Sequence, residues 1–352
     1  MPKTTSFGQY KIESSIMNGS SKNLLLVSDP SGVKFTAKFQ KREDKPKTFN
    51  FDIKVLKHLQ SKSHYIPIYI TSSEDDVYKY YIYELCGPSL KHAMKTVKSQ
   101  MFTLSTTLRV SYHILSAIEQ IHENGIIHRD IKPENIVITN DHDYPIKILN
   151  FGLSKIYLDK DGKHVPERKD VGFRGTAKYA SLNALHGRDL SRRDDLISWF
   201  YVLTEFLFGS LPWGTLKNKS EIMEKKSETK LDDLYLQFQY LEKILEMIQV
   251  LRYEEKPNYE QMKRYIIFTM EELNIEWCEK YDWESENIQL EYGSIDEVLQ
   301  ENEFEPNLGE TNSSQKESSS KSTNFFDKFV TMFRKDKNGY SRLSSDNLVN
   351  LI

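Results

Sequence analysis

The hydrophobic pattern changes its period at Gly87-Pro88, and this change restricts the fold more than any other feature of the 352-residue sequence. Before it, between Tyr10 and about Leu85, apolar residues come in short alternating runs that are typical of strands. Residues 47–60 are the exception, because their apolar positions fall at helical spacing. After Pro88, amphipathic helical patterns dominate, interrupted by short β-branched runs. The pattern predicts an α+β chain: a small strand-rich part with one helix, then a larger, mainly helical part.

Composition and charge exclude several classes of protein. Forty-eight Lys and Arg stand against 51 Asp and Glu, a net charge of −3, so no overall positive charge favours binding to nucleic acid. The two cysteines, Cys86 and Cys278, lie far apart and have no metal-ligand spacing, which is typical of a reducing compartment. The first 15 residues lack the apolar segment of a signal peptide, and no 18 apolar residues run together. We therefore expect a soluble cytoplasmic or nuclear protein.

The string His128-Arg129-Asp130-Ile131-Lys132-Pro133-Glu134-Asn135 carries the clearest chemistry, and it lies between two short strand signals. Phosphoryl transfer to a hydroxyl group needs a carboxylate that orients the hydroxyl and accepts its proton, which Asp130 can supply. It also needs a cation near the transferring phosphoryl group, Lys132, and a neutral oxygen ligand for a metal ion, Asn135. Eight residues in register in a loop favour this catalytic interpretation over an accidental polar loop.

With this string, three further stretches resemble the casein kinase I family of protein Ser/Thr kinases. They are RGTAKYASLNALHGRDLSRRDDL, GSLPWGTL and LRYEEKPNYEQM. The resemblance covers about residues 8–285. It implies the bilobal protein kinase fold, with an N-lobe at about 8–86 and a C-lobe at about 87–285. It also implies that ATP and Mg²⁺ bind between the lobes, and that the substrates are protein Ser/Thr residues often primed by acidic or phosphorylated neighbours.

The resemblance also assigns roles to individual residues. Lys38, on the third strand, would bind the α- and β-phosphates of ATP. Glu84 and Cys86 would belong to the linker whose backbone binds adenine, with Tyr83 at the back of the pocket. Asp195 would brace the catalytic loop from a helix, which is a structural role.

A group of basic residues falls where the family gathers cations for a phosphorylated substrate. Any one of these side chains alone is more often a surface charge than part of a site, so both interpretations stay open. The residues are Arg168, Lys178, and Lys225 or Lys226.

Three departures from the family pattern weaken the catalytic case. The Gly-rich loop aligns with Met17-Asn18-Gly19-Ser20-Ser21-Lys22, so only Gly19 remains of its glycines. Asp52 replaces the helix glutamate that pairs with Lys38, and its side chain is shorter. Asn150 replaces the aspartate of Asp-Phe-Gly, and a neutral amide oxygen is a poorer ligand for Mg²⁺ than a carboxylate. If this last change weakens transition-state stabilisation by about 3–5 kcal/mol, the rate falls by roughly 10²–10⁴.

Two functional interpretations follow from these observations. The first is an ATP-dependent protein Ser/Thr kinase of casein kinase I type, slowed by Asn150 and acting on a protein substrate. The second is a pseudokinase that binds nucleotide weakly or not at all and regulates or scaffolds a protein partner. The complete catalytic loop favours the first, and the three departures favour the second. Nucleic-acid binding is a third possibility that the net charge argues against.

The last part of the chain has a different character. Residues 286–308 form an acidic extension, and residues 309–352 are expected to be a Ser-rich disordered tail. Within the tail, segment 324–335 has one apolar face at helical spacing and basic flanks. We expect this segment to dock on the preceding domain, on a partner or on an anionic membrane, the alternative being a tail with chance aromatics. Its apolar residues are Phe325, Phe326, Phe329, Val330 and Phe333.

Overall fold

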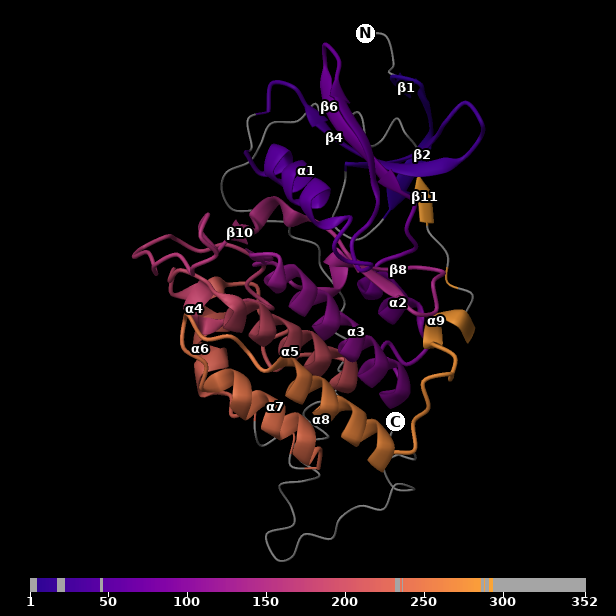
Figure 1. The fold of residues 1–352 in the computed structure, drawn as a ribbon. Helices are drawn as coiled ribbons and strands as arrows, with labels where there is room; N and C mark the ends of the chain where they lie inside the picture. The colour runs from indigo at the N-terminus through magenta and orange to yellow at the C-terminus, as the bar shows by residue number, and fades with distance from the viewer. Residues whose placement is uncertain are drawn as a thin grey trace, which may run out of the picture. The chain divides into compact units, whose positions relative to one another are not determined.

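The computed structural model describes residues 5–17, 23–44, 47–231, 235, 237–285, 288 and 291–293. These residues form two compact units (Figure 1). The smaller unit contains the described residues of 1–45, 70–85 and 290–335, and the larger contains those of 46–69 and 86–289. Gly19, the tail at 309–352 with its segment 324–335, and most of the acidic extension at 286–308 lie outside the described residues.

The smaller unit is built on one sheet, as the alternating sequence pattern predicted. In sheet order its strands are β1 (Ser6–Phe7), β2 (Tyr10–Met17), β3 (Leu24–Ser28), β4 (Lys34–Lys41), β6 (Tyr78–Glu84) and β5 (Tyr69–Glu74), and β11 (Glu291–Gly293) pairs with β2. A turn joins β3 to β4, in which Asp29 Oδ1 accepts the backbone N–H groups of Ser31 and Val33, each at 2.9 Å.

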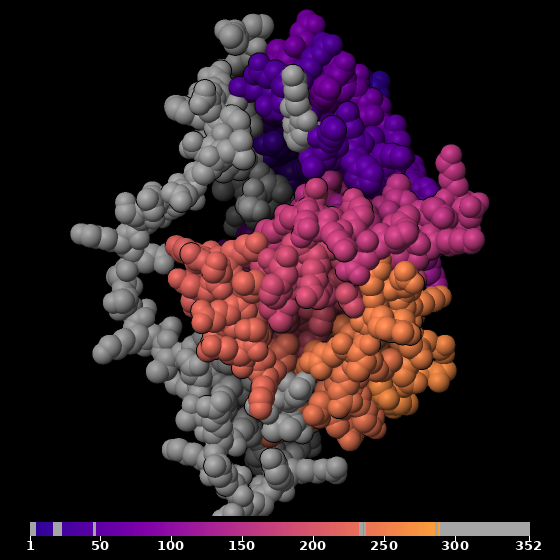
Figure 2. All heavy atoms as spheres, turned by 90° about the vertical axis from the view of Figure 1, so that its left-hand side faces the viewer, coloured from indigo at the N-terminus to yellow at the C-terminus, as the bar shows by residue number. Residues whose placement is uncertain are grey.

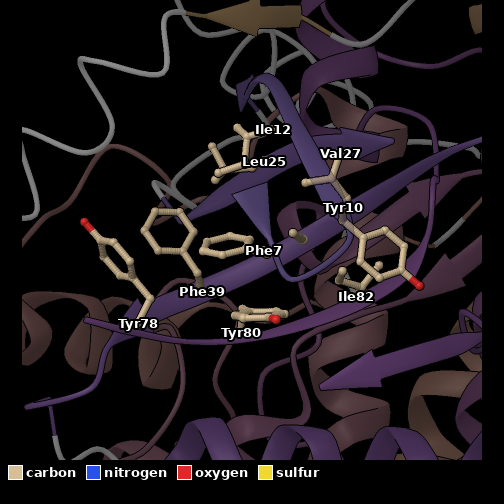
Figure 3. Close-up of a cluster of buried hydrophobic side chains, with 10 residues drawn as sticks. Phe7, Tyr10, Ile12, Leu25, Val27, Phe39, Tyr78, Tyr80 and Ile82 are labelled. Carbon is tan, nitrogen blue, oxygen red and sulfur yellow. The ribbon is translucent and has the colours of Figure 1, made fainter. Parts of the chain in front are cut away.

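Aromatic and aliphatic side chains cover one face of this sheet (Figure 3). Phe7 stacks on Tyr80 with ring centroids 4.4 Å apart, and Phe39 meets Tyr78 edge-on at 5.4 Å. Because side chains alternate along a strand, and Ala37 and Phe39 belong to this cluster, Lys38 lies on the opposite face. There its strand partners are Leu24 and Tyr81.

The larger unit is mainly helical, as predicted. Its helices are α1 (Lys47–Leu59), α2 (Leu90–Thr96), α3 (Leu104–Glu123), α4 (Leu182–Leu185), α5 (Arg192–Phe208), α6 (Lys219–Glu228), α7 (Gln239–Gln249), α8 (Tyr259–Glu272) and α9 (Asp282–Ser285). Helix α3 is followed by Asn124 and Gly125, and Gly125 has a φ of 76°, a conformation that glycine adopts readily at a helix end. Helix α5 is buried along almost its whole length, and Trp199 donates a hydrogen bond to the Ser111 carbonyl on α3 at 3.0 Å.

Short strands and turns between α3 and α4 carry the loops of the site. Strand β7 (Ile126–Ile127) pairs with β10 (Lys155–Ile156), and β8 (Ile136–Ile138) pairs with β9 (Ile146–Ile148). The single 3₁₀ turn η1 (Pro133–Asn135) forms the end of the predicted catalytic string, and η2 (Phe151–Leu153) contains Phe151 and Gly152 of Asn-Phe-Gly. These elements hold the two functional loops at the ends of buried strands.

A buried arginine ties the last described helical region to α3. Arg109 is fully buried. Its guanidinium donates hydrogen bonds to three backbone carbonyl oxygens in a short segment, those of Trp277, Glu279 and Lys280. At the start of α3, the backbone N–H of Thr103 donates to Asp282 Oδ2 at 2.8 Å. Within the described part of the chain, no helix is both long and apolar enough to cross a membrane.

Candidate active site

The carboxylate of Asp130 is held by three side chains. Its Oδ1 accepts the hydroxyl of Thr176 at 2.8 Å, and its Oδ2 accepts Lys132 Nζ at 2.9 Å and Asn135 Nδ2 at 3.0 Å. Lys132 also donates to Thr176 Oγ1 at 2.7 Å. The loop therefore brings the predicted residues Asp130, Lys132 and Asn135 together. Thr176 belongs to the stretch used for the family resemblance, but sequence reasoning gave it no role.

A glycine allows Thr176 to reach the catalytic loop. Gly175 has a φ of +103°, and a Cβ at this position would lie 2.7 Å from the carbonyl oxygen of Arg129. A side chain there would force the two backbones apart. The RGTAKYA stretch thus approaches Asp130 because residue 175 has no side chain.

Asp195, near the start of α5, braces the catalytic loop as the sequence predicted. Its carboxylate is buried and accepts the backbone N–H groups of His128 at 2.6 Å and Arg129 at 2.7 Å. The ring of His122 lies 2.8 Å from its Oδ2. Burial raises the pKa of Asp195, but the His122 contact and the hydrogen bonds outweigh it, so the net pKa shift is downward. An ionised carboxylate therefore orients the residues just before Asp130.

Arg129 joins the catalytic loop to the segment around η2. Its φ is 67°, an uncommon conformation for a non-glycine residue, and its Nε and Nη2 donate to the carbonyl oxygens of Leu153 at 2.6 Å and Ser154 at 2.8 Å. The loop that carries Asp130 and the segment that carries Asn150 are consequently fixed to each other.

Asn150 lies directly before η2 in a left-handed conformation, with φ 67° and ψ 63°. Asparagine adopts this conformation more readily than most residues. Its Nδ2 donates a hydrogen bond of 2.6 Å to Asn135 Oδ1. Asn135 and Asn150, the two predicted metal ligands, are therefore hydrogen-bonded directly to each other.

Asp52 on α1 contacts the same segment. It is only 2% exposed, and its Oδ1 accepts the backbone N–H of Phe151 at 2.8 Å. Gly152 also packs closely against α1, since a Cβ at 152 would lie 3.1 Å from the Thr48 carbonyl oxygen. Lys38 belongs to the smaller unit and Asp52 to the larger, and their ion pair stays a prediction.

The donor atoms near Asp130 can be tested for their fit to a divalent cation. Asn135 and Asn150 offer neutral amide oxygens, and Asn135 Oδ1 already accepts a hydrogen bond. The Asp130 carboxylate is engaged by Lys132, Asn135 and Thr176. Among the described residues, no group of three or more His, Cys, Asp or Glu could hold a metal ion. Because Mg²⁺ prefers charged oxygen ligands, this arrangement does not fit it well.

The nucleotide-binding residues that the sequence suggested lie at the end of β6. Tyr83 is buried, Glu84 is the last residue of the strand, and Cys86, two residues later, is buried. Tyr83 and Glu84 belong to the smaller unit and Cys86 to the larger. Their role in binding adenine stays a prediction.

Of the proposed phosphate-binding cations, Arg168 and Lys178 form ion pairs with buried carboxylates. Arg168 makes a two-pronged contact with Asp189, with Nε–Oδ2 at 2.9 Å and Nη2–Oδ1 at 3.0 Å. Burial raises the pKa of Asp189, but the bonds from Arg168 and Lys155 outweigh it and hold the pKa below its usual value. The Nζ of Lys178 lies 2.8 Å from Oε1 of Glu205.

The two lysines of α6 differ in their surroundings. Lys225 is exposed, whereas Lys226 is 5% exposed and donates hydrogen bonds to the carbonyl oxygens of Ala177 and Ala180. Burial lowers the pKa of Lys226 to about 6. Figure 2 shows the residues between η2 and α5, in magenta, on the surface of the larger unit beside the coral atoms of α6. Phosphate binding by these cations stays a prediction.

Comparison with known proteins agrees with the geometry. The sequence matches the protein kinase domain over residues 24–270. A Dictyostelium discoideum protein named a probable serine/threonine-protein kinase is 34% identical over 250 residues, 70% of this chain and 50% of that protein. A casein kinase I homolog of Kluyveromyces lactis is 33% identical over 287 residues, 78% of this chain and 53% of the homolog. A Caenorhabditis elegans serine/threonine-protein kinase is 28% identical over 288 residues, 79% of this chain and 76% of that kinase.

The chain spans about half the length of the first and second of these relatives. Protein kinase domains act on protein substrates and in general use ATP and Mg²⁺. The match covers strands β3 to β6 of the smaller unit and most helices of the larger one. The relatives are Ser/Thr kinases, some of them casein kinase I homologues. The chain therefore belongs to the protein kinase family and is a bilobal, casein kinase I-like member of it.

Proposed function

We propose that this protein transfers the terminal phosphoryl group of ATP to Ser or Thr hydroxyls of proteins, as a casein kinase I-type enzyme slowed by Asn150. The observation that carries the proposal is the Asp130 carboxylate, oriented by Lys132, Thr176 and Asn135. A positioned carboxylate is what a kinase needs to align the attacking hydroxyl and accept its proton.

The residues around Asp130 would divide the work. Asp130 orients the substrate hydroxyl, and Lys132, whose ammonium lies 2.9 Å from that carboxylate, stays close enough to neutralise charge on the transferring group. Mg²⁺ supplies charge neutralisation to kinases in general, and Asn135 and Asn150 are the residues that would hold it here, weakly, because neither side chain carries a charge. The substitution at 150 would therefore impair the neutralisation of charge on the transferring phosphoryl group more than the positioning of the substrate hydroxyl.

Phosphoryl transfer by the full-length protein tests the proposal. With Mg²⁺, labelled ATP and casein, we expect slow incorporation of label into Ser and Thr. Asp130→Asn should lower the rate by about 10²–10⁴, because the general base is lost while the shape of the side chain is kept. Equal labelling by both proteins would point to a contaminating kinase, and no labelling by either would reject catalysis on casein.

The second candidate function is that of a pseudokinase which regulates a protein partner. The bond from Asn150 to Asn135 favours it, because this bond uses an oxygen that a metal ion would need. A pseudokinase would bind ATP weakly or not at all, and in either case any ATP binding should depend little on Mg²⁺.

Thermal unfolding measures this dependence, since a ligand that binds only the folded state raises the melting temperature. ATP alone should raise the melting temperature slightly. Adding Mg²⁺ should change it by less than about 1 °C, because a weakly bound metal ion adds little to the free energy of unfolding. A large shift that requires Mg²⁺ would contradict weakened metal binding. No shift with either addition would favour a pseudokinase that binds no nucleotide.

The partner in both cases would be a protein. Docking of segment 324–335 on this domain, on a partner or on an anionic membrane also remains a proposal, because that segment lies outside the described residues. The net charge of −3 gives no support to nucleic-acid binding.

A further inference from the structure

The hydrogen bonds around Asn135 fix the orientation of both asparagine amides. Asn135 Nδ2 donates to the backbone oxygen of Asp130 at 2.8 Å and to its Oδ2 at 3.0 Å. Both partners are oxygens that can only accept, so the amino group of Asn135 must face Asp130 and its Oδ1 must face Asn150. Asn150 therefore presents its amino group, at 2.6 Å, to that oxygen. The result is a directed chain of donors from Asn150 through Asn135 to Asp130.

An aspartate at position 150 could not complete this chain. An ionised carboxylate only accepts hydrogen bonds, so it would place one oxygen against another at a separation that is now 2.6 Å. Asn135 could relieve the contact by turning its amide over, but it would then lose both donor bonds to Asp130. A cation between the two side chains would be the remaining way to join a carboxylate at 150 to Asn135 Oδ1.

We propose that Asn150 is a positioning residue that replaces a metal ion as the link between the segment before η2 and the catalytic loop. Its amide holds Asn135, and through Asn135 the Asp130 carboxylate, in place without a divalent cation. An asparagine in place of aspartate at position 150 thus has two effects: it removes a charged metal ligand and adds a hydrogen-bond donor. The inference rests on the proposed function in taking Asp130 as the catalytic carboxylate.

Thermal unfolding of the full-length protein without nucleotide tests this link, first in EDTA and then in excess MgCl₂. Asn150→Asp should lower the melting temperature in EDTA by about 3–8 °C, the range expected when a buried hydrogen bond is replaced by two facing acceptors. MgCl₂ should recover at least half of this loss in Asn150→Asp and should move the unsubstituted protein by less than about 1 °C. A merely structural asparagine would show no such metal dependence on substitution.

Three further tests keep the experiment decisive. Asn150→Ala removes the donor without adding charge, so it should be destabilised in EDTA and not recovered by MgCl₂. Asn124→Asp is the matched control, because Asn124 Nδ2 also donates a hydrogen bond of 2.8 Å, but its acceptor is the backbone carbonyl oxygen of Gln120 and not a side-chain amide. MgCl₂ should not stabilise that variant. In a double-mutant cycle, Asn135→Ala with Asn150→Ala should lower the melting temperature by clearly less than the two single losses combined.

The link is overturned if Asn150→Asp is as stable as the unsubstituted protein in EDTA, if MgCl₂ stabilises both equally, or if the double-mutant losses add. None of these readouts measures catalysis. Absence of labelling in the casein assay would therefore remove the proposed kinase activity and leave the asparagine link standing, whereas additive losses would remove the link and leave the Asp130-dependent labelling intact.

Discussion

Asp195→Ala is expected to lower the free energy of unfolding by about 3–5 kcal/mol, because it removes one partner of a buried, hydrogen-bonded charge. The backbone N–H groups of His128 and Arg129 would lose their acceptor inside the protein, as would the ring of His122. The catalytic loop would also shift, and a displacement of about 1 Å can lower a rate by about 10²-fold. Chemical denaturation and casein labelling measure the two effects.

Asp195→Asn is the matched variant for this experiment. It keeps the volume and one acceptor oxygen, but its amino group would face a donor. We expect it to lose less stability than Asp195→Ala while still slowing labelling. If Asp195→Ala unfolds at the same denaturant concentration as the unsubstituted protein, the carboxylate does not brace the loop.

Asn150→Asp is expected to increase phosphoryl transfer to casein in saturating Mg²⁺ by at least about tenfold, which corresponds to about 1.4 kcal/mol in the activation barrier. The new carboxylate would be a charged ligand beside Asn135, where the present arrangement offers two neutral amides. The rate of label incorporation at saturating ATP measures the gain.

The control for this gain is Asn150→Ala, which removes the amide without adding charge and should not become faster. Asp130→Asn combined with Asn150→Asp should be inactive, because the new ligand cannot replace the general base. A folded Asn150→Asp protein with no increase would place the defect elsewhere, at Asp52 or in the altered loop around Gly19.

The sequence predicted the parts of the site that lie close together along the chain. Asp130, Lys132 and Asn135 occur within six residues of each other, so one loop brings them into contact. Asp195 could be assigned only through the family resemblance, and its contacts confirm the predicted role. Thr176 received no role, because it is 46 residues from Asp130 and only the close approach at Gly175 joins them.

The contacts of individual side chains were the main feature of the site that could not be predicted from the sequence. The sequence predicted a weak metal ligand at Asn150, but the direction of its amide depends on Asn135 and Asp130 together. Lys226 is similar: its sequence context suggests a surface cation, whereas its Nζ lies 4.4 Å from the Tyr201 ring centroid and 4.9 Å from that of Trp213. The burial of this amino group against two aromatic rings is set by tertiary packing.

The strands showed the same limit. Strands β3 and β6 contain the apolar residues from which strands before Gly87 were predicted, and most of these residues are buried in the sheet. Strand β5 gives a weaker signal, since it lies at the sheet edge and its sequence YITSSE contains few apolar residues.

The anchoring of residues 277–282 by Arg109 and Thr103 determines where the chain can be shortened. The family match ends at residue 270, but a polypeptide cut there would deprive the Arg109 guanidinium of its three carbonyl acceptors and of the Tyr281 ring, whose centroid lies 4.2 Å away. Trp283, which meets Phe102 with ring centroids 5.8 Å apart, would be lost as well. A recombinant kinase domain should therefore extend past Trp283, and limited proteolysis should spare the peptide bonds between Trp277 and Trp283 for as long as α3 stays folded.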